Sequence, residues 1–311
     1  MKRIAALFPG QGSQYIGMAA EFLAAGDGAG AVFDRAEAMS GLPLRKLCLE
    51  GPMEELTRTL HLQPAVTVVN IVALEYLKAR GFEFVCAAGH SLGEYSALYA
   101  VGVVGLDDLF RLVTERGILM EREAARNPGA MAALVGLGLG SVEELVARVP
   151  GRVCAANHNN HHQVVISGER DSVAAVCELA AAAGAKAIPL KVSGAWHSPL
   201  VAGAIDDFAG FMAAVPFRSP QLPVFFNVTG EAESDPQVIR GMMAAQISSM
   251  VRWVDIVQRL IDEQIEVVVE IGPKNVLSGL VKKILPADRH MEVHQVDTPA
   301  KADKLLAELG G

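Results

Sequence analysis

The sequence lacks the cysteine spacing of a metal site or of a disulfide framework. Its 311 residues include only four cysteines, and none of them forms a CxxC or another closely spaced pair: Cys48, Cys86, Cys154 and Cys177. Scattered single cysteines are typical of free, mostly buried thiols in a reducing compartment. We therefore expect no disulfide, no metal and no other cofactor.

An excess of basic charge and a long apolar run are also missing. The chain has 27 Lys and Arg against 35 Asp and Glu, a formal net charge of -8. A nucleic-acid-binding protein needs a basic surface, so the acidic balance argues against this class. No window reaches the ~18 consecutive apolar residues of a membrane span. The apolar run Ile4 to Phe8 is too short for a signal peptide. These absences predict a soluble cytoplasmic protein that binds neither nucleic acid nor membrane.

The sequence does contain short apolar strands that alternate with helical patterns, which is typical of an α/β protein. Residues 3–8 and 84–88 predict two buried strands. Residues 54–81 predict a long apolar helix that breaks near Pro64, and 106–125 predict an amphipathic helix with one charged face. The chain is long enough for one large α/β domain or for two smaller ones.

The segment from residue 129 to 190 has a different order of predicted strands and helices. It predicts strands, with two intervening helices, in the order βαββαβ, which is that of a ferredoxin-like unit. Ser141 is the expected N-cap of the first helix, and Pro189 indicates that the last strand lies at an edge. We therefore expect an inserted small subdomain at 127–195 and a large α/β subdomain formed by 1–126 and 196–311.

The central motif is Gly89-His90-Ser91-Leu92-Gly93, which fits the pattern G-x-S-x-G. An apolar strand precedes it and a helical pattern follows, so Ser91 is expected on a tight strand-to-helix turn. There the backbone N–H groups at the helix N-terminus stabilise developing negative charge. The alternative is a glycine-rich turn with a capping serine, but the strand-turn-helix context favours a nucleophile.

A serine nucleophile needs a base, and the chain has eight histidines. Those in polar stretches that we expect to be exposed are His61, His290 and His294. Those clustered in one loop, with no cysteine or acidic partner to make a metal site, are His158, His161 and His162. His90 adjoins Ser91 on the turn and is expected to point away from it. His197, in a turn after a strand, remains as the candidate base, although the residues alone leave its role open.

Several motifs together resemble one family. In chain order they are FPGQGSQ at 8–14, GHSLGEYSAL at 89–98, Arg116-Gly117, GAM at 129–131, QVVISG at 163–168, GAWHSPL at 194–200, VRW at 251–253 and EIGP at 270–273. Their order and spacing resemble the malonyl-CoA:acyl-carrier-protein transacylase family, which includes the acyltransferase domains of fatty acid and polyketide synthases. The resemblance runs from about residue 3 to about residue 285. It implies an α/β-hydrolase-like large subdomain with an inserted ferredoxin-like small one.

The resemblance also implies a catalytic apparatus. Ser91 would attack the thioester and His197 would be its base, held by a backbone carbonyl at the position of Ser249 instead of a carboxylate. The backbone N–H groups of Gln11 and Leu92 would form the oxyanion hole. The reaction would be a ping-pong transfer of malonyl from coenzyme A to the phosphopantetheine thiol of a holo acyl carrier protein.

Further residues are expected to contact the substrate. The resemblance aligns Arg116 with the arginine that pairs with the malonyl carboxylate, and a guanidinium can grip a carboxylate with two hydrogen bonds. The alternative is a solvated helix arginine paired with a neighbouring acid. Trp196 stands where malonyl-selective relatives often carry Phe and should crowd a methyl branch. The resemblance also matches Asn157 and Asn159 to positions near the acyl and pantetheine site. Glu121 stands where the family usually has glutamine, and it either faces the pocket or points outward and pairs with Arg122 or Arg116.

Three other functions stay open from the sequence. A trans-acting acyltransferase of a polyketide synthase would look much the same. An acyl hydrolase of the same fold is disfavoured by Arg116, because such hydrolases act on neutral acyl chains. A catalytically silent binding module is disfavoured by the presence of Ser91, His197 and Arg116 together. We expect a monomer.

Overall fold

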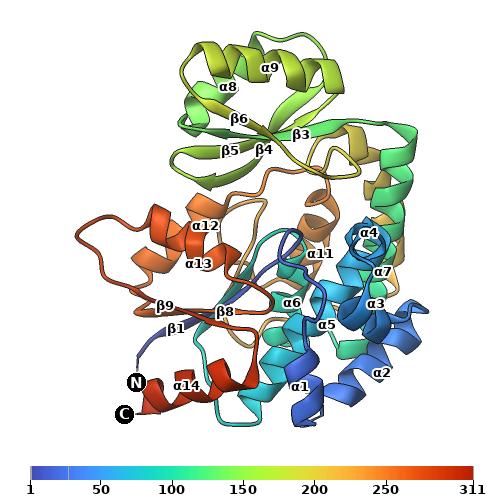
Figure 1. Ribbon diagram of the computed structural model, residues 1–311, viewed down its shortest axis with the longest axis vertical. Helices are drawn as coiled ribbons and strands as arrows, with labels where there is room; N and C mark the ends of the chain where they lie inside the picture. Colours follow the sequence, from blue (N-terminus) through green and yellow to red (C-terminus); the bar gives the residue numbers. More distant parts are fainter. Residues whose placement is uncertain (1, 27, 311) are drawn as a thin grey trace.

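The computed structural model describes residues 2–26 and 28–310, and its larger part is built on a five-stranded sheet (Figure 1). The strand order is β7-β2-β1-β8-β9, and all neighbours run parallel. The bounds are Ile4–Phe8 for β1, Cys86–Gly89 for β2, Val224–Phe225 for β7, Val267–Ile271 for β8 and Glu292–Val296 for β9. The central strands β1 and β8 are entirely buried, as expected for a parallel sheet covered on both faces.

Alternate residues of β1 face two different cores, because side chains of a strand point to opposite faces. Ala6 and Phe8 belong to the core formed with α5 (Thr59–Lys78) and α7 (Leu106–Arg126). Ala5 and Leu7 belong to the core formed with α12 (Trp253–Asp262) and α13 (Val276–Ile284). The sheet is therefore the middle layer of a three-layer α/β subdomain.

The other helices of this subdomain pack against the sheet, against α5 and α7, or against one another. They are α1 Ala20–Ala25, α2 Ala29–Ser40, α3 Leu44–Glu50, α4 Met53–Thr57, α6 Gly93–Ala100, the 3-10 helix η1 Pro199–Ala204, α10 Ile205–Ala213, α11 Pro236–Ala245 and α14 Pro299–Gly310. By length and composition α5 could cross a membrane, but most of it is buried inside this subdomain, as is usual for a core helix of a soluble protein.

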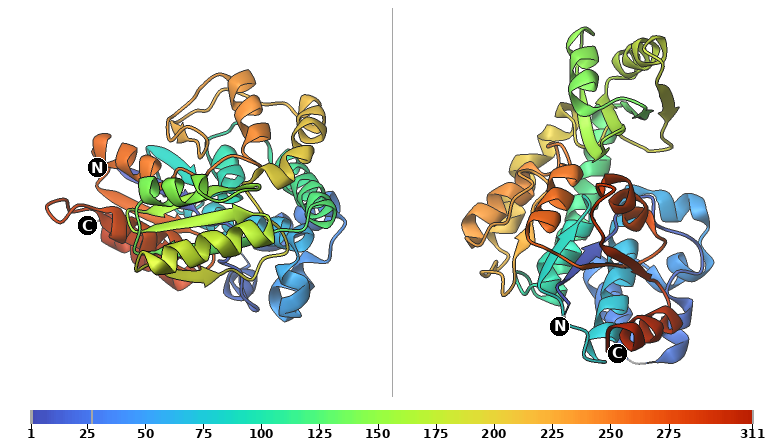
Figure 2. Two further views of the ribbon diagram at one scale, coloured as in Figure 1. Left: turned by 90° about the horizontal axis from the view of Figure 1, so that it is seen from above. Right: turned by 90° about the vertical axis from the view of Figure 1, so that its left-hand side faces the viewer.

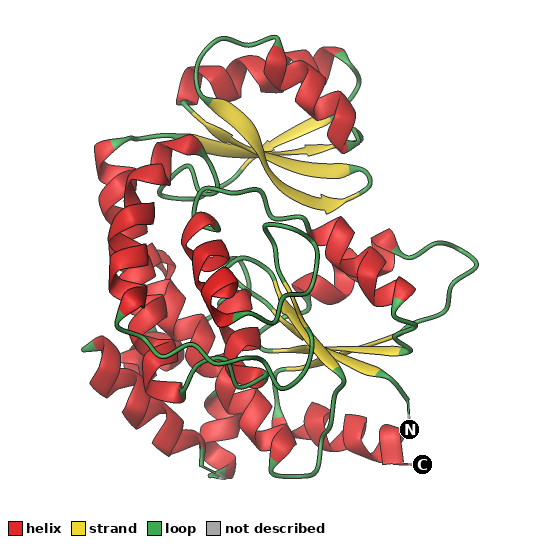
Figure 3. Ribbon diagram, turned by 180° about the vertical axis from the view of Figure 1, so that it is seen from behind, coloured by secondary structure: helices red, strands yellow, loops and turns green. Residues whose placement is uncertain are grey.

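A four-stranded antiparallel sheet forms the second part, which extends from one end of the molecule (Figures 2 and 3). Its elements are β3 Ala130–Val135, α8 Leu139–Ala147, β4 Val153–Asn160, β5 Gln163–Gly168, α9 Arg170–Ala182 and β6 Lys186–Pro189. The βαββαβ order and the strand order β4-β5-β3-β6 are those of a ferredoxin-like unit. The predicted fold class is thus confirmed, and β6 lies at an edge as expected. All six elements fall within 127–195, although the subdomain boundaries themselves stay a prediction.

Some local predictions were wrong. The long helix does not break at Pro64; it is interrupted earlier, at Arg58, and α5 continues through the proline because almost every later side chain is buried. Ser141 is not an N-cap: α8 begins two residues earlier behind Gly138, and Leu139 packs against the core of the small subdomain.

Two strands were also misjudged from the sequence. His158 is not in a loop, because β4 extends to Asn160 and pairs with β5 through two irregularities of register. The strand β9, which contains His294, was not expected at all. It is an edge strand whose residues are mostly half-buried, so it shows little apolar alternation.

Candidate active site

Ser91 lies on a sharp turn between β2, which ends at Gly89, and α6, which begins at Gly93. Its φ is 51°, a left-handed conformation that is uncommon for a residue with a side chain. The turn is compact because its glycines touch other backbone: a Cβ on Gly93 would overlap the carbonyl of Phe8, and one on Gly10 would overlap that of His90. These contacts hold the strand-to-helix turn that the motif predicts.

Asn227 holds this turn from the chain segment after β7, a role the sequence did not reveal. Its Oδ1 accepts a hydrogen bond from the backbone N–H of Ser91 at 2.6 Å, and its Nδ2 donates to the carbonyl of Gly89 at 2.7 Å. Asn227 is fully buried. It fixes the backbone on which the nucleophile stands.

His197 is in hydrogen-bond contact with Ser91, with Nε2 2.7 Å from Oγ. Its Nδ1 lies 3.0 Å from the carbonyl oxygens of both Gln246 and Ser249. Because carbonyl oxygens only accept, Nδ1 carries the proton and Nε2 is free to accept the hydroxyl proton of Ser91. The structure thus brings Ser249 to the position expected for it and adds Gln246, which the sequence did not indicate.

The surroundings of His197 keep it neutral. Burial, followed by the charges of Arg116 and His90, lowers the pKa of His197 to about 3. The imidazole is therefore unprotonated near pH 7 and can act as a base. Its own φ of 57° places it on a strained turn, as is common for residues at functional sites.

Arg116 projects from α7 to the same place and is only 1% exposed. It donates to Oε1 of Gln63 at 2.9 Å, to Oε1 of Gln246 at 3.0 Å and to Oγ of Ser91 at 3.3 Å. All three partners are neutral. Among the residues that the structure describes, no carboxylate forms an ion pair with Arg116. The alternative of a solvated arginine paired with a neighbouring acid does not hold.

Gln246 joins these parts through its side chain. Nε2 donates to the carbonyl of Ser91 at 2.9 Å and to Oε2 of Glu94 at 2.6 Å, while Oε1 accepts from Arg116. Burial raises the pKa of the Glu94 carboxyl to about 8, against the opposing effects of its hydrogen bonds and of Arg116. The amide of Gln246 thus separates the buried acid from the buried cation.

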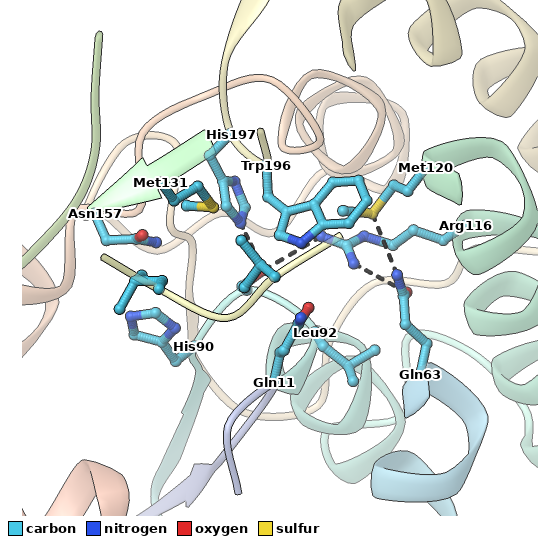
Figure 4. A pocket seen from close by; sticks show the side chains of 13 residues that line it. Gln11, Gln63, His90, Leu92, Arg116, Met120, Met131, Asn157, Trp196 and His197 are labelled. Atoms are coloured by element: carbon cyan, nitrogen blue, oxygen red, sulfur yellow. Dashed lines mark hydrogen bonds between the residues drawn. The ribbon is translucent and has the colours of Figure 1, made fainter. Parts of the chain in front are cut away.

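Ser91, His197 and Arg116 line a pocket between the two subdomains (Figure 4). Met131 and Asn157 come from the small subdomain. The members from the large subdomain and the loop leading to it are Gln11, Gln63, His90, Ser91, Leu92, Arg116, Met120, Leu190, Val192, Trp196 and His197. Within the described chain, no acceptor takes the backbone N–H of Gln11 or Leu92, so both are free to bind an oxyanion.

Two other residues considered from the sequence do not line the pocket. Asn159 does not line the pocket; its Oδ1 is 2.9 Å from Nε2 of His90, and Asn157 is the asparagine that faces the site. Glu121 does not line the pocket; it pairs with Arg58 at 3.0 Å, instead of with Arg122 or Arg116 as expected. Across residues 2–26 and 28–310, no three or more His, Cys, Asp or Glu side chains are grouped as metal ligands.

Comparison with known proteins identifies the family of the chain. Residues 6–301 match the family model described as "Acyl transferase domain". The chain is 38% identical to the malonyl CoA-acyl carrier protein transacylase of Bacillus subtilis, over 99% of this chain and 98% of that protein. It superposes with a TM-score of 0.93, at 36% identity, on an acyl carrier protein S-malonyltransferase from Vibrio cholerae, covering 97% and 99% of the two chains.

A further solved structure shows a malonyl-transacylase bound to its type II PKS acyl-carrier protein. The TM-score is 0.94 at 34% identity, and the match covers 98% of this chain and 99% of that one. The match extends over nearly the whole chain and includes the pocket. The chain therefore belongs to the acyl transferase domain family and is an acyltransferase.

Proposed function

We propose that the protein is a malonyl-CoA:acyl-carrier-protein S-malonyltransferase that works through an ester on Ser91. The observation that carries this proposal is the position of Arg116: a buried cation with only neutral partners, within hydrogen-bond distance of the nucleophile's oxygen. A buried charge is costly unless it is paired. A substrate with a free carboxylate supplies the missing partner at the distance of one short acyl chain from Ser91.

In the first half-reaction, Ser91 attacks the thioester carbonyl of malonyl-CoA and His197 accepts its proton at Nε2. The backbone N–H groups of Gln11 and Leu92 bind the oxyanion, each such donor being worth about 3–4 kcal/mol in the transition state. The intermediate collapses, the C–S bond breaks, and His197 returns the proton to the coenzyme A thiolate. The carbonyls of Gln246 and Ser249 hold the imidazole in the required tautomer throughout.

In the second half-reaction, the phosphopantetheine thiol of a holo acyl carrier protein enters the same pocket. His197 takes the thiol proton, the thiolate attacks the Ser91 ester, and the proton passes to the serine oxygen as the ester breaks. The same residues act in both halves because the two thiols are chemically alike. No cofactor takes part, and we expect a cytoplasmic monomer that does not associate with membranes.

Mass spectrometry of the intact protein tests this function. After incubation with an equimolar mixture of malonyl-, methylmalonyl- and acetyl-CoA, the wild-type protein should carry mainly one malonyl group. Ser91→Ala should carry none, although its fold is unchanged. Labelling of the variant, or a preference for acetyl by the wild-type protein, would contradict the mechanism.

The carrier protein is a separate question. The likeness to a transacylase bound to a type II PKS acyl-carrier protein supports a second candidate, an acyltransferase that serves polyketide synthesis. Transfer rates from the malonyl-enzyme to a fatty acid carrier protein and to a polyketide carrier protein separate the two. Water as the acceptor would instead indicate an acyl hydrolase, and would be seen as loss of the malonyl ester without any carrier protein.

A further inference from the structure

Trp196 carries an unpaired hydrogen-bond donor at the pocket. Its side chain lines the pocket beside His197 and Arg116, and the residue is 3% exposed. Nevertheless its Nε1–H finds no acceptor within the described part of the chain. Buried indole N–H groups usually have a partner, and each exception needs an explanation. For a donor at a substrate pocket, the explanation is that the substrate supplies the acceptor.

The indole is held in one orientation. Gly194 has no Cβ, and a Cβ there would lie 2.5 Å from Cη2 and 2.7 Å from Cζ3 of the indole; the same position is 2.7 Å from Cβ of Ala124. The far edge of the six-membered ring therefore packs against Gly194, which leaves the nitrogen-bearing ring at the opposite end. In Figure 4 this end is turned toward the side of the pocket on which Gln11 and Leu92 lie, next to Arg116.

The chemistry of the pocket restricts the acceptor. The thioester oxygen is expected at the free backbone N–H groups of Gln11 and Leu92, which are placed for it. The other end of a malonyl group is a carboxylate with two oxygens and about four lone-pair directions. Arg116 can occupy two of these directions, so the carboxylate still has acceptor capacity for a further donor beside the guanidinium.

We propose that the indole N–H of Trp196 donates a hydrogen bond to the free carboxylate of the malonyl group, and that it acts with Arg116 as a second carboxylate-binding group. The inference rests on the proposed function. It differs from a purely steric role, because a bulky ring that only crowds the α-carbon would act through its size and would not need its nitrogen.

Trp196→Phe tests the proposal, since it removes the N–H and keeps an aromatic ring. Loss of a hydrogen bond to a charged group should lower kcat/KM for malonyl-CoA roughly 10- to 100-fold. Acetyl-CoA lacks the carboxylate, so its kcat/KM should fall less, and the ratio of malonyl to acetyl kcat/KM should drop. Equal losses on both substrates would mean that Trp196 has a packing role or bonds the thioester carbonyl, and they would overturn the proposal. An unchanged ratio of malonyl to acetyl kcat/KM would overturn it as well.

Trp253→Phe is the matched control. Trp253 is the other tryptophan of the chain, it is fully buried, and its Nε1 is also without a partner among the described residues. It packs against the ring of His90 at 5.5 Å between centroids but does not line the pocket. This variant should leave the ratio of malonyl to acetyl transfer unchanged.

A direct measurement uses the indole resonance of Trp196. In the Trp253→Phe variant labelled with ¹⁵N-tryptophan, a single indole N–H signal remains, and we expect it to move downfield in the malonyl-enzyme but not in the acetyl-enzyme. The same signal in both esters would overturn the proposal even if Trp196→Phe fails to fold. Failure of the wild-type protein to form a malonyl ester would overturn the proposed function as well, whereas a normal ester with an unshifted signal overturns this inference alone.

Discussion

Two glutamines, rather than two acids, contact the guanidinium of Arg116. A carboxylate at either position would form a buried ion pair with Arg116 and neutralise the charge that the substrate is proposed to meet. An amide oxygen satisfies the same N–H group without a charge. The choice of residue at Gln63 and Gln246 thus keeps a buried cation available, at the expense of stability.

Gln63→Glu tests whether a neutral side chain at this position keeps Arg116 available for the substrate carboxylate. Gln63 is 1% exposed, and a glutamate of the same size would pair with Arg116 at the distance of the present hydrogen bond. We expect kcat/KM for malonyl-CoA to fall at least about tenfold, the value of one charge-assisted hydrogen bond, while acetyl transfer is kept or increased. Gln63→Met, which has a similar volume and no charge, is the control and should affect malonyl transfer less. A Glu variant that still prefers malonyl would show that Arg116 is not the carboxylate site.

The pKa of His197 should respond to Arg116. After burial, the charge of Arg116 is the next cause that lowers this pKa. Removing the charge in Arg116→Met raises the pKa, so the imidazole is protonated, and inactive as a base, at a higher pH. In kcat/KM for acetyl-CoA, the acid limb of the wild-type protein should lie below about pH 4. That of the variant should move up toward the ordinary histidine pKa, into a window measured from about pH 4 to about pH 8.

Arg122→Met is the control for the pH dependence of kcat/KM in the Arg116→Met variant. Arg122 is also on α7, but it pairs with Asp207 and Glu123 outside the pocket. Its variant should keep the wild-type acid limb. An identical profile for the Arg116 and Arg122 variants would mean that the charge of Arg116 does not lower the pKa of His197.

At the scale of elements, the turn at Ser91 depends on the contact between the start of α6 and the end of β1. Gly93→Ala would place a methyl group on the carbonyl of Phe8, and backbone cannot yield as a flexible side chain can. We expect a loss of unfolding free energy of roughly 1–3 kcal/mol, typical of overpacking, together with a large loss of Ser91 acylation. Urea denaturation and the rate of ester formation measure the two effects.

Gly279→Ala is the corresponding control in α13. A Cβ there meets nothing within 4 Å, and the residue is inside a helix. This substitution should be stabilising by about 0.4–1 kcal/mol because it reduces the freedom of the unfolded chain. If both glycine variants behaved alike, close backbone approach would not be what fixes the turn.

The sequence predicted the elements that carry regular patterns and missed those that tertiary contacts decide. The turn at Ser91 and the βαββαβ segment were predictable because apolar strands and glycines leave local signals. The strand β9 was not, because its half-buried residues alternate weakly. Pro64 was misread because burial of α5 outweighs one missing backbone hydrogen bond.

At the site, too, residues in local sequence patterns were predicted, and residues placed only by tertiary contacts were missed. Ser91 and Arg116 stand in recognisable motifs. His197 was a candidate because of its turn, and the family resemblance gave its expected role as the base. Gln246 and Asn227 were missed because each acts over more than a hundred residues of chain, through an amide that no local pattern marks. Of the two asparagines expected near the site, Asn157 lines the pocket and Asn159 does not. They are two residues apart and would share a face of a regular strand, but the pairing of β4 with β5 is irregular between His158 and Asn160.

At the scale of the whole molecule, the two subdomains share a core, although each has its own sheet. Met131, Ala156 and Val165 of the small sheet belong to the same apolar cluster as α5 and α7. The backbone of Val251 adds two hydrogen bonds across the junction, accepting from the N–H of His158 at 2.9 Å and donating to the carbonyl of Ala156 at 2.8 Å. The pocket lies at this junction, so its geometry depends on both parts staying together.

A shared core predicts one cooperative unfolding transition, and the two tryptophans can test it. Trp196 belongs to the cluster that joins the subdomains, and Trp253 belongs to the cluster on the other face of the parallel sheet. The Trp253→Phe and Trp196→Phe variants therefore each report one core by fluorescence. Within each variant, the fluorescence midpoint in urea should coincide with the midpoint from far-ultraviolet circular dichroism. A Trp196 signal that changes at lower urea than the dichroism of the same variant would show that the junction opens first, and that the pocket can separate while the parallel sheet stays folded.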